Sequence, residues 1–410
     1  MADPVRNLRP IVAGQAVSLL GDYVALLALP LLIVDLTGSA LDLGLTTAFE
    51  TLPTLLFGFV AGVVIDRVSI KRALIFADLA RGAAFGLLAL ATVGDVTRPW
   101  MIFAAAFLTG AMTVAFDSGF QAWMPALLSE GRLVSVNTTL QFARTSAWTI
   151  GPPLAGFLIG TVGFGAALGL NALTFVVSAG FIVVLSETRG RPPVEPEPFG
   201  LSFRTGISFL WREPRLRLAT LAATAINLTF VPMEALFVLF AQEHLDIRDE
   251  FLIGWFFAGH ALLGTLGVGL APRLTRRIGL GRVFVVGFLL LGTGFLVLAA
   301  AADAIAGLSP TTGTIIAIVP AGVAVAGVSF ANVSVTTLRQ QLTPPELLGR
   351  VIAASRTLAW AGLPVGAAVG GVLGNSLGVR TVYVGASLTI VVCALLMTMS
   401  QLWRRRVTEV

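Results

Sequence analysis

Charged residues are scarce in this chain: 12% of its 410 residues are charged, whereas 56% are hydrophobic. A soluble domain has about 25% charged residues, so this composition excludes an ordinary water-exposed surface. The apolar residues fall in runs of about twenty, which is the length that crosses the hydrocarbon core of a bilayer as a helix. The sequence therefore predicts an all-α polytopic membrane protein.

The residues on which most catalytic and metal sites are built are also rare. The chain has two histidines and a single cysteine, Cys393, which excludes an intrachain disulfide. It has no His-Glu-x-x-His, no paired cysteines and no Walker loop, and this argues against a zinc site and against direct coupling to ATP. We expect no metal, no cofactor and no enzyme activity. Two other function classes would be recognised by experiment. An intramembrane enzyme built on buried acids would alter its substrate chemically, and a receptor or scaffold would signal without moving any substrate across the membrane.

Positive charge is modest and dispersed. The net charge is +5, but no basic stripe is interleaved with exposed aromatic residues, which argues against a nucleic-acid partner. Most of the 27 Lys and Arg residues lie in short segments between apolar runs, on the side that the positive-inside rule assigns to the cytoplasm. An even number of spans places both termini on that side. The twelve predicted spans are 11–34, 43–65, 73–94, 99–122, 137–160, 165–186, 218–241, 251–272, 282–302, 311–336, 351–373 and 380–402.

A polar stretch divides the spans into two groups of six. We expect an N-terminal six-helix bundle at 1–187, a cytoplasmic linker at 188–217 and a C-terminal six-helix bundle at 218–410. The second part of the linker, LSFRTGISFLWREPRLR, has apolar and basic residues at helical spacing, which predicts an amphipathic helix on the inner membrane surface. VIDRVSIKR follows the second span and APRLTRRIGLGR follows the eighth. The halves therefore read as a repeat, a plan known among transporters.

The loop after the second span contains a glycine, an Asp-Arg pair and a basic pair. It resembles the signature loop of the major facilitator superfamily. The matching residues are Gly62, Asp66, Arg67, Lys71 and Arg72. The family's small residue after Asp-Arg is replaced by Val68-Ser69. The resemblance implies that Asp66 and Arg67 join Asp117 of the fourth span in a charge cluster that latches the closed inner gate.

Other segments resemble one branch of the same superfamily, the bacterial efflux proteins similar to macrolide and enterobactin exporters. These segments are SLLGDYVALLALPLLIVDLTGS, ADLARG, QFARTSAWTIGPPLAG and LLGRVIAASRTLAWAGLPVGAAVGG. The third contains a motif that resembles the fifth-helix motif of the superfamily's antiporters, formed by Gly151, Pro152, Pro153 and Gly156. The resemblance implies that this motif bends the fifth helix against the eighth and seals the closed protein. The matching smooth face of the eighth helix is expected at Gly264, Gly267 and Gly269.

Several charged or polar residues lie inside the predicted spans, where a charge costs at least about 2.5 kcal/mol unless it is paired, hydrated or neutral. Asp78 and Arg81 are three residues apart, so a local ion pair accounts for both. Arg144 either binds an anionic substrate or balances a buried acid, and balancing is the favoured role. We expect His260 to be packed and hydrogen-bonded rather than a proton carrier, and Arg356 to reach the inner surface by snorkelling.

Three acids in the spans, Asp22, Glu50 and Glu234, have no cation within four residues. In the superfamily the first, fourth, seventh and tenth helices line the cavity, so the resemblance implies that Asp22 and Glu234 face it. As proton carriers we rank Asp22 first, because it lies deepest and on a cavity helix, and Glu234 second, as the matching acid of the other half. Glu50 is third, because the second helix usually packs beside the cavity. Gly21, beside Asp22, and Pro232, close to Glu234, predict local helix breaks. The amides expected to line the cavity are Gln15, Gln121, Asn227 and Asn332.

The resemblance and the acids together predict secondary active export of amphipathic or hydrophobic small molecules, driven by proton antiport. A carboxylate in a water-poor cavity holds a proton readily, until the substrate displaces it. The alternative is that the acids are hydrogen-bonded to neighbouring helices and never titrate. Export of a specific endogenous product, such as a siderophore or lipid, and proton-coupled uptake are the alternative functions. We expect a monomer in the bacterial cytoplasmic membrane, whose partners are its small-molecule substrate, protons and the bilayer.

Overall fold

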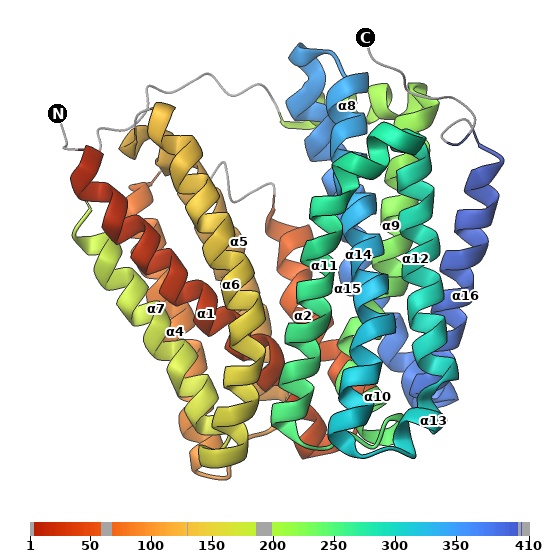
Figure 1. Cartoon of the computed structure of the whole chain (residues 1–410). Helices are drawn as coiled ribbons and strands as arrows, with labels where there is room; N and C mark the ends of the chain where they lie inside the picture. The colour runs from red at the N-terminus through yellow and green to blue at the C-terminus, as the bar shows by residue number, and fades with distance from the viewer. Residues whose placement is uncertain (1–3, 59–67, 129, 186–198, 401–402, 404–410) are drawn as a thin grey trace. The chain divides into compact units, whose positions relative to one another are not determined.

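The computed structural model describes residues 4–58, 68–128, 130–185, 199–400 and 403, and these residues form helices joined by short connections (Figure 1). Ten of the described helices are long and apolar enough to cross a membrane. Two more, α2 (Ala40–Phe57) and α6 (Glu130–Val162), overlap the second and fifth predicted spans. Both carry polar side chains that line the cavity described below. Each of the twelve predicted spans therefore overlaps a helix, although 59–65 of the second lies outside the described residues and the seventh is divided between the helices 214–235 and 237–244.

The chain divides into two compact units. Unit 1 comprises Met1–Val194 together with Asp249–Ala258. Within it α1 packs against α6 and α7, α4 packs against α5 and α7, and α2 packs against α5. Its remaining helices are α1 (Pro4–Thr37), α4 (Ile70–Val93), α5 (Pro99–Leu127) and α7 (Phe164–Val183).

Unit 2 comprises Glu195–Arg248 and Gly259–Val410. Its helices are α8 (Phe199–Arg212), α9 (Pro214–Ala235), α10 (Phe237–His244), most of α11 (Glu250–Ile278), α12 (Leu280–Ala300), α13 (Ala302–Ala306), α14 (Pro310–Leu342), α15 (Pro345–Leu377) and α16 (Val379–Thr398). Here α9 packs against α15 and α16, and α12 packs against α14 and α16. These pairings repeat those of unit 1: the first helix of each half contacts the fifth and sixth, and the third contacts the fourth and sixth. The repeat predicted from the loops is thus present in the packing.

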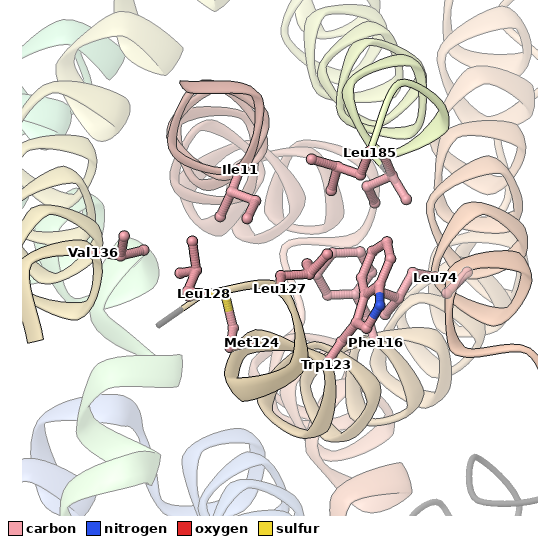
Figure 2. Close-up of a cluster of buried hydrophobic side chains, with 11 residues drawn as sticks. Ile11, Leu74, Phe116, Trp123, Met124, Leu127, Leu128, Val136 and Leu185 are labelled. Carbon is pink, nitrogen blue, oxygen red and sulfur yellow. The ribbon is translucent and has the colours of Figure 1, made fainter. Parts of the chain in front are cut away.

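One end of unit 1 is filled by a cluster of buried apolar side chains, shown in Figure 2. It lies where α1, α4 and α6 begin and where α5 and α7 end. In a bilayer lipid is as apolar as leucine, so close packing of this kind supplies much of the attraction between helices. The labelled members are Ile11, Leu74, Phe116, Trp123, Met124, Leu127, Leu128, Val136 and Leu185.

One of the two predicted helix breaks is confirmed and the other is wrong. α9 ends at Ala235 and α10 begins at Phe237, just after Pro232, which cannot donate a backbone hydrogen bond. By contrast, α1 continues through Gly21 without a break. The glycine serves packing instead, because a Cβ added there would collide with the side chains of Thr174 and Asn171 in α7.

The predicted amphipathic helix of the linker is present as α8 and groups with unit 2. Its apolar face lies against α15: Leu210 is fully buried, and a Cβ added to Gly206 would collide with the backbone carbonyl of Arg350. Trp211 and Arg212 are exposed on α8. The helix therefore has one face covered by protein and another that carries basic and aromatic side chains.

A basic side chain near the start of the third helix of each half contacts the chain at or beyond the end of the sixth: Lys71 contacts the carbonyl end of α7, and Arg282 contacts Trp403, beyond the end of α16 at Thr398. In unit 1, Lys71 Nζ donates hydrogen bonds to the carbonyls of Val183 (2.7 Å) and Leu185 (2.8 Å). In unit 2, Arg282 Nε donates to the carbonyl of Trp403 (3.3 Å), and its guanidinium lies 5.5 Å from the centre of that ring. The last carbonyls of a helix lack intrahelical partners and carry partial negative charge, so a cation there is favourable. Lys71 thus ties α4 to α7.

We predict that Lys71→Met lowers the stability of unit 1 by about 1 kcal/mol, because two carbonyls lose a charged donor. Thermal unfolding of the purified protein in detergent measures the effect. Arg72→Met is the matched control, since Arg72 is the next residue and is exposed. Equal melting temperatures for the two variants would contradict the capping role of Lys71.

Candidate functional site

A cavity of about 330 Å³ lies among the helices of unit 1. All six spanning helices of the unit contribute to its wall, which combines apolar, aromatic and hydroxyl side chains with three charged ones. The residues that line it are Leu19, Asp22, Tyr23, Ala25, Leu26, Leu29, Glu50, Thr51, Thr54, Phe85, Thr109, Gly110, Thr113, Arg144 and Phe175.

The three charged residues on the wall come from three helices: Asp22 from α1, Glu50 from α2 and Arg144 from α6. None of them forms a hydrogen bond or an ion pair with another described residue. Asp22 is half-buried, and Glu50 and Arg144 are exposed. Two carboxylates and one guanidinium give the wall a net charge of −1 when both acids are ionised, so the site favours a proton or another cation.

Glu50 lies on this wall because α2 and α5 approach closely at one glycine. A Cβ added to Gly110 of α5 would collide with the backbone carbonyl of Glu50. Any larger residue at Gly110 would push α2 away. Glu50 of the second span therefore lines this pocket of unit 1 together with Asp22.

The carboxylate of Asp22 lies in the electrostatic field of charges from several helices. Arg81 attracts it, whereas Asp117, Asp78 and Glu50 repel it. On its own helix the next residue, Tyr23, stacks on Trp148 of α6 with ring centroids 6.1 Å apart. Sequence reasoning missed Tyr23 and the threonines of the wall, because their residue types are common in spans and carry no spacing signal.

The predicted ion pair between Asp78 and Arg81 is confirmed. The two side chains are joined within α4, and each is almost fully buried. The Arg81 guanidinium also lies over the rings of Phe116 (4.6 Å) and Phe175 (4.3 Å), and it donates to the Thr113 hydroxyl at 3.4 Å. The pair therefore lies directly behind the wall to which Thr113 and Phe175 belong.

The other candidate cavity residues lie away from this wall. Glu234 is half-buried in α9 of unit 2, next to the break where the Tyr383 hydroxyl donates to the carbonyl of Met233. The Asn227 amide donates to the carbonyl of Ala359 in α15 at 2.7 Å, so it joins two helices. The remaining amides are outside the lining: Gln15 is half-buried, and Gln121 and Asn332 are exposed.

The structure also places the remaining span residues. His260 is buried, at 2% exposure. Arg356 is exposed, and its guanidinium lies 4.1 Å from the ring centre of Trp360. Of the loop motif, Gly62, Asp66 and Arg67 lie outside the described residues. Arg72 and Asp117 are exposed on α4 and α5.

The Gly-Pro-Pro motif of α6 lies in two close helix contacts. A Cβ added to Gly151 would crowd Tyr23 of α1. A Cβ added to Gly156 would collide with the backbone of Glu250 and Phe251, at the start of α11. Backbone against backbone is the closest approach that two helices can make, and glycine is the residue that permits it.

The expected partner glycines of this contact are wrong. A Cβ added to Gly264 or Gly267 would meet Val325 or Ala326 of α14, so these two glycines pack inside unit 2. The glycine of α11 that faces the motif is Gly254, where an added Cβ would collide with the backbone of Pro152. The first turns of α11, the eighth span, thus pack against α6, and its later turns pack against α14.

Comparison with known sequences identifies the family. A sequence model described as Major Facilitator Superfamily matches residues 11–362. The chain belongs to this superfamily. It is therefore a multi-pass membrane protein of a transporter family, built from twelve helices in two related bundles.

The curated relatives of this superfamily member include two named efflux proteins. Macrolide efflux protein A of Streptococcus pyogenes is 25% identical over 392 residues, which cover 93% of this chain and 92% of the relative. Multidrug efflux pump Tap of Mycobacterium tuberculosis is 27% identical over 385 residues, which cover 90% of this chain and 88% of the relative.

Solved structures share the fold of this superfamily member at low sequence identity. The nucleoside transporter NupG is 12% identical with a TM-score of 0.75, over 97% of this chain and 99% of that one. A bacterial homologue of the iron transporter ferroportin, in its inward-facing state, is 16% identical with a TM-score of 0.75, over 98% of this chain and 99% of that one. These likenesses concern the fold alone.

We predict that Gly156→Leu prevents assembly of the contact between α6 and the start of α11, because the side chain would occupy the space of a neighbouring backbone. The expected result is either loss of folded protein or a proton leak across vesicles without substrate. Size-exclusion chromatography and a pH-sensitive dye inside the vesicles measure the two effects. Gly180→Leu is the control, since an added Cβ there meets nothing within 4 Å. A tight and fully active Gly156→Leu variant would contradict the packing role.

Proposed function

We propose that this protein is a secondary active transporter that exports amphipathic or hydrophobic small molecules in exchange for protons, by alternating access. Membership of the superfamily and the names of the two curated relatives support efflux. The observation that carries the proton part is the cavity wall of unit 1. There two carboxylates, Asp22 and Glu50, face one space without an ion pair or hydrogen bond to another described residue.

The chemistry follows from the cost of charge inside a membrane. An unpaired carboxylate in a poorly hydrated cavity is more stable with a proton on one of its oxygens than without it. When substrate enters, that proton must leave or the substrate must remain outside, and this exclusion couples the two. A cationic substrate competes with the proton by charge pairing, and a neutral one competes for space. Arg144 offsets one of the two negative charges, so the cavity is neutral when it holds one proton.

Asp22 is the first candidate for the proton carrier. It is the deeper of the two acids, being half-buried where Glu50 is exposed, and burial is what penalises its charged form. Glu50 shares the same space and repels ionised Asp22. Glu234 is the corresponding candidate in unit 2, and it becomes the first candidate if Asp22 does not titrate.

The remaining features of the proposal rest on resemblance and on charge distribution. Asp66, Arg67 and Asp117 latch the closed inner gate, and the Gly-Pro-Pro motif seals the closed protein as in antiporters. The protein acts as a monomer in the bacterial cytoplasmic membrane with both termini in the cytoplasm, because its loop cations lie mostly on one side.

A panel of candidate compounds added to reconstituted vesicles tests the function. We expect uptake of substrate into the vesicles to drive protons out of them, with broad acceptance of amphipathic compounds. Proton release in response to one siderophore or lipid alone would identify an exporter of a specific product. Protons moving in the same direction as the compound would identify an uptake symporter and overturn the proposal.

We predict that Asp22→Asn abolishes uphill export but leaves downhill substrate exchange intact, because the variant keeps the shape of the site and loses its proton. Vesicle transport with and without a pH gradient measures the two activities. Asp35→Asn is the matched control, since Asp35 lies on the same helix and is exposed. Loss of both activities, or of neither, would exclude Asp22 as the carrier and pass the test to Glu234→Gln.

A further inference from the structure

Arg81 is a buried cation that the proposed transport cycle does not use. Its side chain is 3% exposed and that of its partner Asp78 is 0% exposed. A buried pair of this kind costs several kcal/mol of desolvation per ion before its attraction is counted, so it is poor evidence for stability by itself. Its presence in a span therefore calls for a reason beyond packing.

The guanidinium of Arg81 is held in one place by two aromatic rings. Its carbon lies 4.6 Å from the ring centre of Phe116 in α5 and 4.3 Å from that of Phe175 in α7. A planar guanidinium stacks on aromatic faces through its charge and its shape, which a lysine ammonium cannot reproduce. The positive charge is thus fixed in a cleft between α4, α5 and α7.

The ion pair does not satisfy all of its own polar atoms. Arg81 contacts Asp78 through a single carboxylate oxygen, Oδ1. Asp78 Oδ2 and Arg81 Nε are both buried and have no hydrogen-bond partner among the described residues.

Arg81 is also directly behind the cavity that contains Asp22. Its Nη1 donates to the Thr113 hydroxyl at 3.4 Å, and both Thr113 and the stacked Phe175 line the cavity. One hydroxyl and one ring therefore separate the fixed cation from the space that Asp22 faces. Arg81 attracts the ionised carboxylate of Asp22 from this position.

Every helix around Asp22 contributes to its electrostatic surroundings. Glu50 of α2, Asp78 of α4 and Asp117 of α5 oppose its negative charge. Arg144 of α6 lies on the same wall, Tyr23 is the neighbour on α1, and the closest polar groups of α7, Asn171 and Thr174 beside Gly21, are uncharged. The two cations of this set are Arg81 and Arg144, and of these Arg81 is the buried one.

We propose that Arg81 is a positioning residue for the proton carrier: its aromatic-clamped charge stabilises ionised Asp22 and so promotes release of the proton, while Asp78 offsets enough of that charge to keep Arg81 buried. The inference rests on the proposed role of Asp22. A purely structural role for the pair, tying α4 to α5 and α7, would leave the protonation of Asp22 unchanged when the charge alone is removed.

The test compares two variants that differ by one charge. Arg81→Met alone would leave Asp78 buried without a counter-ion, so both variants carry Asp78→Asn. The first adds Arg81→Lys, which keeps a positive charge, and the second adds Arg81→Met, which has a similar length and no charge. The readout is pH-difference infrared spectroscopy of the full protein in lipid without substrate. The C=O band of protonated Asp22 is assigned by its loss in Asp22→Asn.

We expect the Asp22 band of the Asp78→Asn/Arg81→Met protein to titrate about one pH unit above that of the Asp78→Asn/Arg81→Lys protein, because a nearby cation favours the charged carboxylate. Asp78→Asn alone should titrate below the unmodified protein, because Arg81 then acts without its counter-ion. Arg356→Met is the control: it removes another span arginine that stacks on an aromatic ring, and the Asp22 band should not move.

Equal titration midpoints of the Asp22 band in the Asp78→Asn/Arg81→Lys and Asp78→Asn/Arg81→Met proteins would overturn the positioning role. An Asp22 band that does not titrate in any variant would overturn it too. Transport separates this inference from the proposed function. A shifted band together with normal uphill export by Asp22→Asn would sustain the electrostatic role of Arg81 and refute Asp22 as carrier. An unshifted band with abolished export would do the reverse.

Discussion

The cost of placing charge inside a bilayer is the constraint on which this structure depends. Each ionisable side chain within a span must be paired, kept neutral or given a polar space. Unit 1 uses two of these solutions: Asp78 is paired with Arg81, whose guanidinium also lies over two aromatic rings, and Asp22 and Glu50 open onto a cavity. The pair and the cavity lie next to each other, so the charges behind the wall influence the chemistry proposed for the cavity.

Close helix contacts determine which side chains reach that cavity. Glycines at Gly21, Gly110 and Gly151 stand where a Cβ would collide with α7, α2 or α1. Because the helices approach so closely at these points, Asp22 and Glu50 face one space although they belong to different helices. In a bilayer, packing of this kind replaces the hydrophobic effect as the main attraction between helices. The same glycines that stabilise the bundle therefore define the site.

The two halves share their pairings but differ in their charges. The third helix contacts the sixth in each. Lys71 contacts the carbonyl end of α7, and Arg282 contacts Trp403, beyond the end of α16. The buried Asp78–Arg81 pair and the two-acid cavity lie in unit 1, whereas Glu234 of unit 2 lies at a helix break beside Tyr383. The repeat thus preserves the scaffold and allows the ionisable groups to diverge.

The sequence by itself determined the membrane class, the twelve helices, the division into related halves and the Asp78–Arg81 pair, because hydropathy and helical spacing are local properties. Only the tertiary structure decided that Glu50 joins Asp22 on one wall, that Gly21 packs rather than breaks its helix, and that Gly254 rather than Gly264 faces the α6 motif. These outcomes depend on the rotation of each helix about its axis. That rotation is fixed by contacts between residues far apart in the chain, and spacing within one helix carries no record of them.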